Sequence, residues 1–109
     1  MSKRNFDFIL ENGTIYDGSG NKCYKSDIGI IGDTIIETGD LRDAECKERI
    51  NVNNFIVSPG FIDIHTHSDF TLIIDGNADS QLHQGVTTEV IGQCGHSVAP
   101  VRSKNEIPK

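Results

Sequence analysis

The chain has 109 residues, with 10 lysines and arginines against 16 aspartates and glutamates, which gives a formal net charge of −6. This length leaves room for no more than one domain of ordinary size. The charge argues against nucleic acid as a partner, because proteins that bind nucleic acids carry clustered basic residues. Residues 55–101 contain five acidic residues and no lysine or arginine, so this stretch suits a metal ion better than a phosphate.

No apolar run approaches the ~18 residues that a membrane helix needs. Asp7 and Glu11 interrupt the N-terminal segment that would have to form the apolar part of a signal peptide. We therefore expect no membrane partner and a cytoplasmic protein. The cysteines Cys23, Cys46 and Cys94 are odd in number and form no CxxC pair, so a disulfide framework is not expected.

The first half of the chain has the pattern of β structure. Phe6, Phe8 and Leu10 alternate with Asp7, Ile9 and Glu11, which is the period of a half-buried strand. Asn12-Gly13 is a turn signal, and the Asp17–Gly20 segment is typical of a loop.

Further strands are predicted before Pro59. Two β-branched runs, Ile28–Ile31 and Thr34–Thr38, flank Gly32-Asp33 and predict a hairpin with a type II′ turn. Residues 40–49 are highly charged and are predicted to form a solvated loop, and residues 50–57 another strand.

The pattern changes after Pro59. Phe61–Ile64 is a compact apolar run, as in strands that are buried on both faces. A short helix is expected around residues 78–82, capped by Asp75 or Asn77, and Val86–Ile91 is a second strand. Strand, helix and strand within about 30 residues predict a βαβ unit with two parallel strands.

Two histidines, His65 and His67, follow the first of these strands. Side chains at positions i and i+2 share one face of a strand, so both imidazoles should point the same way. Two neutral imidazoles supply half of a zinc site. Asp63 and Asp69 could orient a ring or add an oxygen ligand. The alternative is a pair of partly buried histidines with local hydrogen bonds and no metal.

Cys94 lies in a Gly-Gln-Cys-Gly segment just past the second strand. Parallel strands joined by one crossover end at the same edge, where α/β proteins bind ligands, so Cys94 should emerge beside His65 and His67. Imidazole and thiolate together suit zinc. The alternative role for Cys94 is a small buried side chain. His96 faces the same edge as a solvated loop residue or a substrate contact, whereas His83 is expected to be structural.

The segment Pro59-Gly-Phe-Ile-Asp-Ile-His-Thr-His67 resembles the hallmark of the amidohydrolase superfamily, metal-dependent hydrolases built on a (β/α)₈ barrel. Gln84-Gly-Val-Thr-Thr88, followed by Gly92-Gln-Cys-Gly95, Ser97 and Pro100, resembles the N-acyl-D-amino-acid deacylase (D-aminoacylase) family. The resemblance extends over residues 6–101, because the opening segment is similar to the small β-sandwich domain of that family.

The resemblance implies a division of the chain. Residues 1–58 would form the N-terminal part of the β-sandwich domain, residues 59–101 the first βαβ unit of the barrel, and residues 102–109 a polar tail. The fold class is therefore α/β with a β-rich N-terminal part. A complete barrel needs roughly 250 residues, so we expect an N-terminal fragment that is inactive alone.

The resemblance also implies roles. His65 and His67 match the histidine pair that binds metal, and Cys94 matches the cysteine that ligates Zn²⁺ where many relatives use a carboxylated lysine. Asp69 and His96 would be outer-sphere or substrate contacts. The general base, an aspartate on a later strand, is expected beyond Lys109. The substrate would be a small N-acyl-D-amino acid, and the remaining partner would be the rest of the polypeptide or a second copy.

Two other functions stay open. One is a hydantoinase- or dihydroorotase-like enzyme that acts on cyclic amides, which a bridging lysine on a later strand would favour. The other is a non-catalytic β-rich module that binds a metal or a partner. The residues around Cys94 favour the deacylase.

Overall fold

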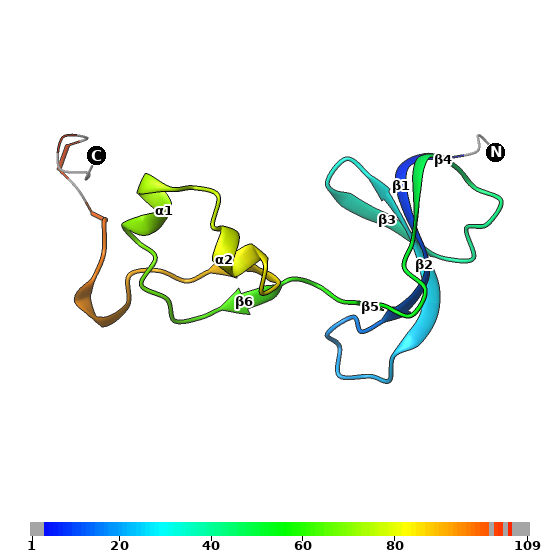
Figure 1. The fold of residues 1–109 in the computed structure, drawn as a ribbon, viewed down its shortest axis with the longest axis horizontal. Helices are drawn as coiled ribbons and strands as arrows, with labels where there is room; N and C mark the ends of the chain where they lie inside the picture. Colours follow the sequence, from blue (N-terminus) through cyan, green and yellow to red (C-terminus); the bar gives the residue numbers. More distant parts are fainter. Residues whose placement is uncertain (1–3, 101, 104, 106–109) are drawn as a thin grey trace. The chain divides into compact units, whose positions relative to one another are not determined.

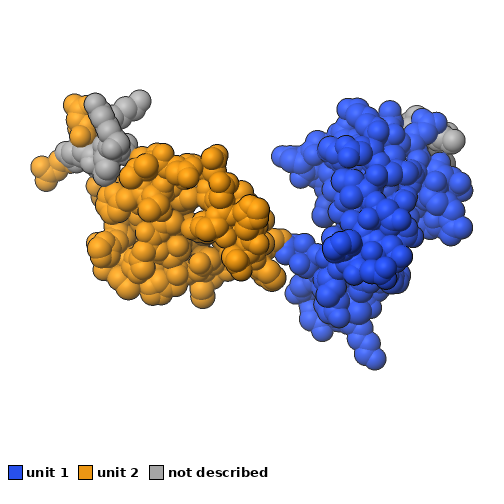
Figure 2. Space-filling model, in the orientation of Figure 1, with its two compact units in different colours: residues 1–59 blue, residues 60–109 orange. Residues whose placement is uncertain are grey.

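The computed structural model describes residues 4–100, 102–103 and 105, and this part of the chain is rich in β-strands (Figure 1). It divides into two compact units, residues 1–59 and residues 60–109, which are drawn in different colours in Figure 2. Most of the expected polar tail, residues 102–109, lies outside the described residues. No helix in the described part is long and apolar enough to span a membrane.

The first unit is built on a five-stranded sheet with the order β3-β2-β1-β4, in which β5 also pairs with β1. The strands are β1 (Asn5–Ile15), β2 (Tyr24–Ile31), β3 (Thr34–Gly39), β4 (Glu45–Asn51) and β5 (Ile56–Val57). Pairing is antiparallel along β1-β2 and β2-β3, and parallel where β4 and β5 meet β1. The prediction of β structure in this half is confirmed.

The predicted hairpin is confirmed as β2 and β3, which turn at Gly32-Asp33. Gly32 has φ +60°, a conformation open to glycine at little steric cost, and Asp33 has no positive φ. A carboxylate on the neighbouring strand holds the turn, because Asp7 Oδ2 accepts the Gly32 N–H at 2.6 Å. The other Asp7 oxygen pairs with Lys47 on β4 at 2.5 Å, so one side chain of β1 contacts both β4 and the β2–β3 turn.

Two predictions for this unit are wrong. Asn12-Gly13 is not a turn but an irregularity within β1, where the pairing register shifts between Leu10 and Gly13 and Asn12 has φ +65°. A bulge requires the same special backbone angles as a turn, so the residue types do not separate the two. The charged segment 40–49 is a loop only as far as Ala44, because β4 begins at Glu45 and exposes its charged side chains at the sheet edge.

The core of the first unit is small. Phe6, Ile9 and Leu41 form a buried cluster, and Ala44 and Cys46 pack against it. Ile9 is 0% exposed, whereas Phe8, which was expected on the apolar face, is 39% exposed. Strand alternation defines two faces but does not say which of them becomes covered.

The second unit contains a two-stranded parallel sheet of β6 (Phe61–Asp63) and β7 (Val86–Glu89). The predicted parallel pairing is confirmed, although both strands are shorter than expected. Two four-residue helices, α1 (Thr71–Ile74) and α2 (Asp79–Leu82), connect them. A 3₁₀ segment, η1 (Gln93–Gly95), follows β7.

The expected helix cap is wrong. Ala78, with φ +51°, occupies the N-cap of α2, and no side chain caps the helix. Asp75 instead accepts the backbone N–H of Asn77 at 3.1 Å, in a turn that precedes the helix. Asp and Asn side chains satisfy such turns as readily as helix ends. Helix α1 was not predicted, because a single turn leaves no readable period in the sequence.

The apolar side chains of β6 are exposed, contrary to the expectation of a strand buried on both faces. Phe61 and Ile62, and Ile64 beyond the strand end, are all exposed in the described structure. Two strands and two short helices provide too little surface to cover both faces of a sheet. The exposed apolar groups predict a tendency of this unit to associate.

We expect Gly29→Ala to destabilise the first unit. A Cβ at Gly29 would lie 2.5 Å from Cε1 of the buried Phe6 ring, so the ring and strand would have to move apart. Overpacking of this kind costs about 1–3 kcal/mol. Urea unfolding should show a lower midpoint. An unchanged midpoint for the unfolding of this unit would contradict the packing argument.

We expect Asp7→Asn to reduce the acid sensitivity of the first unit. The Lys47 ammonium and then the Gly32 N–H lower the pKa of Asp7 below its ordinary value of 3.8. A lowered folded-state pKa contributes stability above the unfolded pKa, and that contribution is lost as the pH falls through the folded pKa. The gap in unfolding free energy between parent and variant should therefore narrow from neutral pH to about pH 2. A gap that stays constant would contradict this account.

Candidate metal centre

The end of β6 places two histidines at one edge of the second unit. The strand ends at Asp63, whose Oδ1 accepts the His65 backbone N–H at 3.0 Å. The Asp63 carbonyl oxygen accepts the Val90 N–H at 2.8 Å, which ties this strand end to the end of β7. The imidazoles of His65 and His67 stand edge to face, with ring centroids 5.5 Å apart.

The third residue comes from the turn after β7. Gly92 and Gly95 have φ +86° and +78°, and Cys94 between them has φ +54°. The left-handed conformation costs a non-glycine residue about 1–2 kcal/mol. Such strain persists only where the surroundings fix it, and it is common at functional sites.

The structure brings His65, His67 and Cys94 together. Cys94 Sγ lies 3.4 Å from His65 Nε2, and one ligand atom from each of the three residues lies within 4.8 Å of the others. A tetrahedral zinc ion with bonds of about 2.0–2.3 Å separates neighbouring ligand atoms by about 3.3–3.6 Å. The thiol and imidazole donors are the types that zinc prefers, and all three side chains are exposed, so the residues fit this ion.

The other two histidines differ in position. His96 follows η1, and its ring centroid lies 5.5 Å from that of His67, so it borders the cluster as expected. His83 is the C-cap of α2, is exposed, and is not part of the cluster.

The two aspartates near the histidines bind backbone rather than imidazole. Asp63 accepts the His65 N–H, and Asp69 Oδ1 accepts the Gly92 N–H at 2.8 Å. Neither of these contacts is with an imidazole. Strand ends and tight turns leave backbone N–H groups without partners, and short acidic side chains satisfy them.

Sequence analysis missed a contact between Ser68 and Glu89. Glu89 Oε2 accepts a hydrogen bond from the hydroxyl of the buried Ser68, and Glu89 Oε1 is buried without a partner among the described residues. Thr66 Oγ1 lies 3.0 Å from Ser68 Oγ and extends the chain of contacts. The pairing register of β6 and β7 sets where Glu89 lies relative to the segment that follows β6. This register cannot be read from the sequence.

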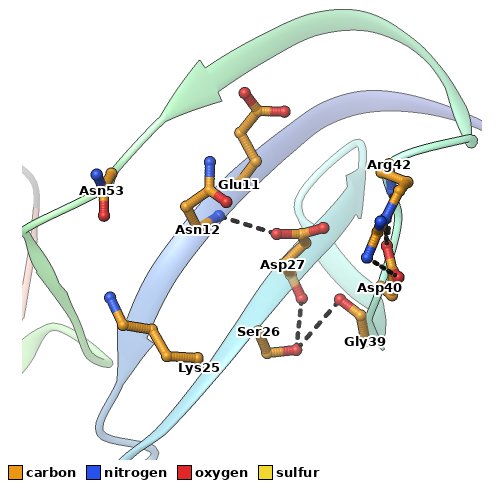
Figure 3. A pocket seen from close by; sticks show the side chains of 9 residues that line it. All are labelled: Glu11, Asn12, Lys25, Ser26, Asp27, Gly39, Asp40, Arg42 and Asn53. Atoms are coloured by element: carbon orange, nitrogen blue, oxygen red, sulfur yellow. Dashed lines mark hydrogen bonds and ion pairs between the residues drawn. The ribbon is translucent and has the colours of Figure 1, made fainter.

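The first unit has a polar hollow of about 760 Å³ (Figure 3). Its polar groups are largely paired with each other. Asp27 accepts backbone N–H groups of Asn12 and Leu41, and Asp40 pairs with Arg42. Carboxylates that are already satisfied in this way have little left to bind a ligand, so the hollow is not the better candidate.

The chain is similar in sequence to several known deacylases. No family model matches the chain. D-aminoacylase of Alcaligenes xylosoxydans xylosoxydans is 44% identical over 100 residues, which is 92% of this chain and 21% of that protein. N-acyl-D-glutamate deacylase of the same organism is 38% identical over 94 residues, or 86% of this chain and 19% of that protein.

Solved structures show the same similarity. A crystal structure of D-aminoacylase superposes with a TM-score of 0.84 at 45% identity, over 88% of this chain and 20% of that one. N-acyl-D-glutamate deacylase from Bordetella bronchiseptica, complexed with zinc and a phosphonate inhibitor, gives a TM-score of 0.84 at 34% identity, over 89% of this chain and 20% of that one. The chain spans about one fifth of the length of these relatives. The expected resemblance is confirmed: the chain is similar, in sequence and fold, to part of the N-acyl-D-amino-acid deacylases of the amidohydrolase superfamily.

Proposed function

We propose that the chain supplies the first three metal ligands of a zinc-dependent N-acyl-D-amino-acid deacylase. His65 and His67 would bind the ion through imidazole nitrogens, and Cys94 through its thiolate. The observation that carries the proposal is the convergence of these three side chains, from two different segments, within 4.8 Å. The similarity to D-aminoacylase, which extends over most of the chain, supports the same assignment.

In such a site zinc lowers the pKa of a water molecule to about 7, so that the water can attack an amide carbonyl. The residues of this chain would hold and orient the ion. A catalytic zinc keeps one position open for water, and three protein ligands would leave a fourth position for it. The general base would come from an aspartate beyond Lys109, and the substrate would be an N-acyl-D-amino acid.

The proposal extends to the fold. Residues 1–58, in the first unit, would form part of a small β-sandwich. Residues 59–101 would form the first βαβ unit of a (β/α)₈ barrel. In the barrel, later strands would cover the exposed Phe61 and Ile62 side chains. We also propose a cytoplasmic location, with the rest of the polypeptide or a second copy as partner.

We expect the 109-residue chain to bind one zinc ion, with Cys94 as one of its ligands. Titration with Co²⁺, which occupies zinc sites, should produce a thiolate charge-transfer band that zinc then removes. Cys94→Ser should abolish the band, and His67→Ala should weaken binding, because each removes a donor from a three-residue set.

Matched variants make the test specific. His83→Ala removes an exposed histidine of the same unit, and Cys23→Ser removes an exposed thiol of the other unit. Both should leave the titration unchanged. A band that survives in Cys94→Ser but disappears in Cys23→Ser would contradict the proposed ligand set.

We expect the chain alone to hydrolyse no N-acyl-D-amino acid, even when zinc is bound. A (β/α)₈ barrel needs roughly 250 residues, and this chain spans about one fifth of its relatives. The assay is release of the free D-amino acid by the zinc-loaded chain. Turnover that depends on zinc and is lost in His67→Ala would show that these residues suffice and would overturn this part of the proposal.

A further inference from the structure

Asp69 is the most deeply buried titratable side chain near the candidate metal centre. It is 2% exposed, although it follows His67 by only two residues on an otherwise open edge. Its Oδ1 accepts the N–H of Gly92, which precedes Cys94 by two residues, at 2.8 Å. One hydrogen bond with a buried acceptor therefore joins the segment that carries the histidines to the turn that carries the cysteine.

The turn needs such an anchor. Cys94 is in the left-handed region, and the turn's own backbone contact is local, from the His96 N–H to the Gln93 carbonyl at 2.9 Å. Two other contacts reach from the turn to the histidine segment, and both are exposed and long at 3.4 Å. The Gln93 amide donates to the Ile64 carbonyl, and Cys94 Sγ lies against His65 Nε2. The Asp69 bond is shorter, at 2.8 Å, and its acceptor is buried, so water competes less for it than for the exposed contacts.

Ser68, the residue before Asp69, makes a different contact. Ser68 donates to Glu89, the last residue of β7, which lies before the turn begins. Ser68 therefore joins the histidine segment to the strand, whereas Asp69 joins it to the turn itself. This division predicts that the position of Cys94 depends on Asp69 more than on Ser68.

We propose that Asp69 is a positioning residue that fixes Cys94 beside His65 and His67 by holding the Gly92 N–H. The inference rests on the proposed zinc site, because its consequence is the coordination of the Cys94 thiolate. Asp69 does not bind the metal in this account. Its second oxygen, Oδ2, is buried and has no partner among the described residues, so an amide nitrogen in its place would break no hydrogen bond among them.

The test compares Asp69→Ala with Asp69→Asn in the 109-residue chain, with the exposed Asp79→Ala as matched control. Cobalt titration reports the thiolate band, and zinc competition reports affinity. Asp69→Ala should weaken zinc binding about 10- to 100-fold, the usual effect of losing a residue that orients a ligand. Asp69→Asn keeps an acceptor for the Gly92 N–H and should bind like the parent. Equal losses in both Asp69 variants would overturn the proposal, because the carboxylate charge itself would then be required.

A double-mutant cycle separates positioning from a general effect on folding. If Asp69 acts through Cys94, Asp69→Ala should cause little further loss of zinc affinity in a Cys94→Ser background. A loss of the same size in both backgrounds, as an unfolded second unit would produce, would overturn the proposal.

A metal-free measurement keeps this inference distinct from the proposed function. The Gly92 amide should exchange its hydrogen faster in Asp69→Ala than in the parent, and at the parent rate in Asp69→Asn. If the parent chain binds no cobalt, the proposed zinc site is contradicted. The exchange measurement still tests the Asp69–Gly92 contact in that case, because it needs no metal. Unchanged exchange in Asp69→Ala would contradict the anchoring role.

Discussion

The parallel pairing of β6 with β7 is the constraint on which the candidate site depends. Because the strands run in the same direction, both chain segments leave the sheet at one edge, and residues separated by 29 positions, His65 and Cys94, meet there. The Val90 N–H to Asp63 carbonyl bond continues this alignment one step past the strands. An antiparallel pair would send the two segments to opposite ends, and no choice of ligand residues could then assemble the cluster.

The pairing alone is not sufficient, since a cysteine ligand also needs a turn that points its sulfur back toward the histidines. Two glycines and a left-handed Cys94 provide that turn, at a conformational cost that buried contacts must offset. Buried Ser68 and Asp69 follow the histidines directly and make those contacts. The first unit contributes a separately packed sheet, and its polar hollow is occupied by its own ion pairs and hydrogen bonds.

Much of this was predictable from the sequence because periodicity and turn residues are local signals. The β2–β3 hairpin followed from Gly32-Asp33 between β-branched runs, and the parallel β6–β7 pair from its spacing. The bulge at Asn12 and the start of β4 at Glu45 were missed, because partner strands decide them rather than local residue types. The proximity of His65, His67 and Cys94 followed from topology, whereas the bonds of Ser68 and Asp69 depend on register and side-chain packing.

The central claim is that one ion is held by donors from both strand ends. X-ray absorption at the zinc edge, on the zinc-loaded chain, tests this most directly. The account predicts one sulfur neighbour at about 2.3 Å together with nitrogen neighbours at about 2.0–2.1 Å, and loss of the sulfur shell in Cys94→Ser. A zinc ion surrounded by nitrogen and oxygen alone in the parent chain would contradict it, because the turn after β7 would then play no part in binding the metal.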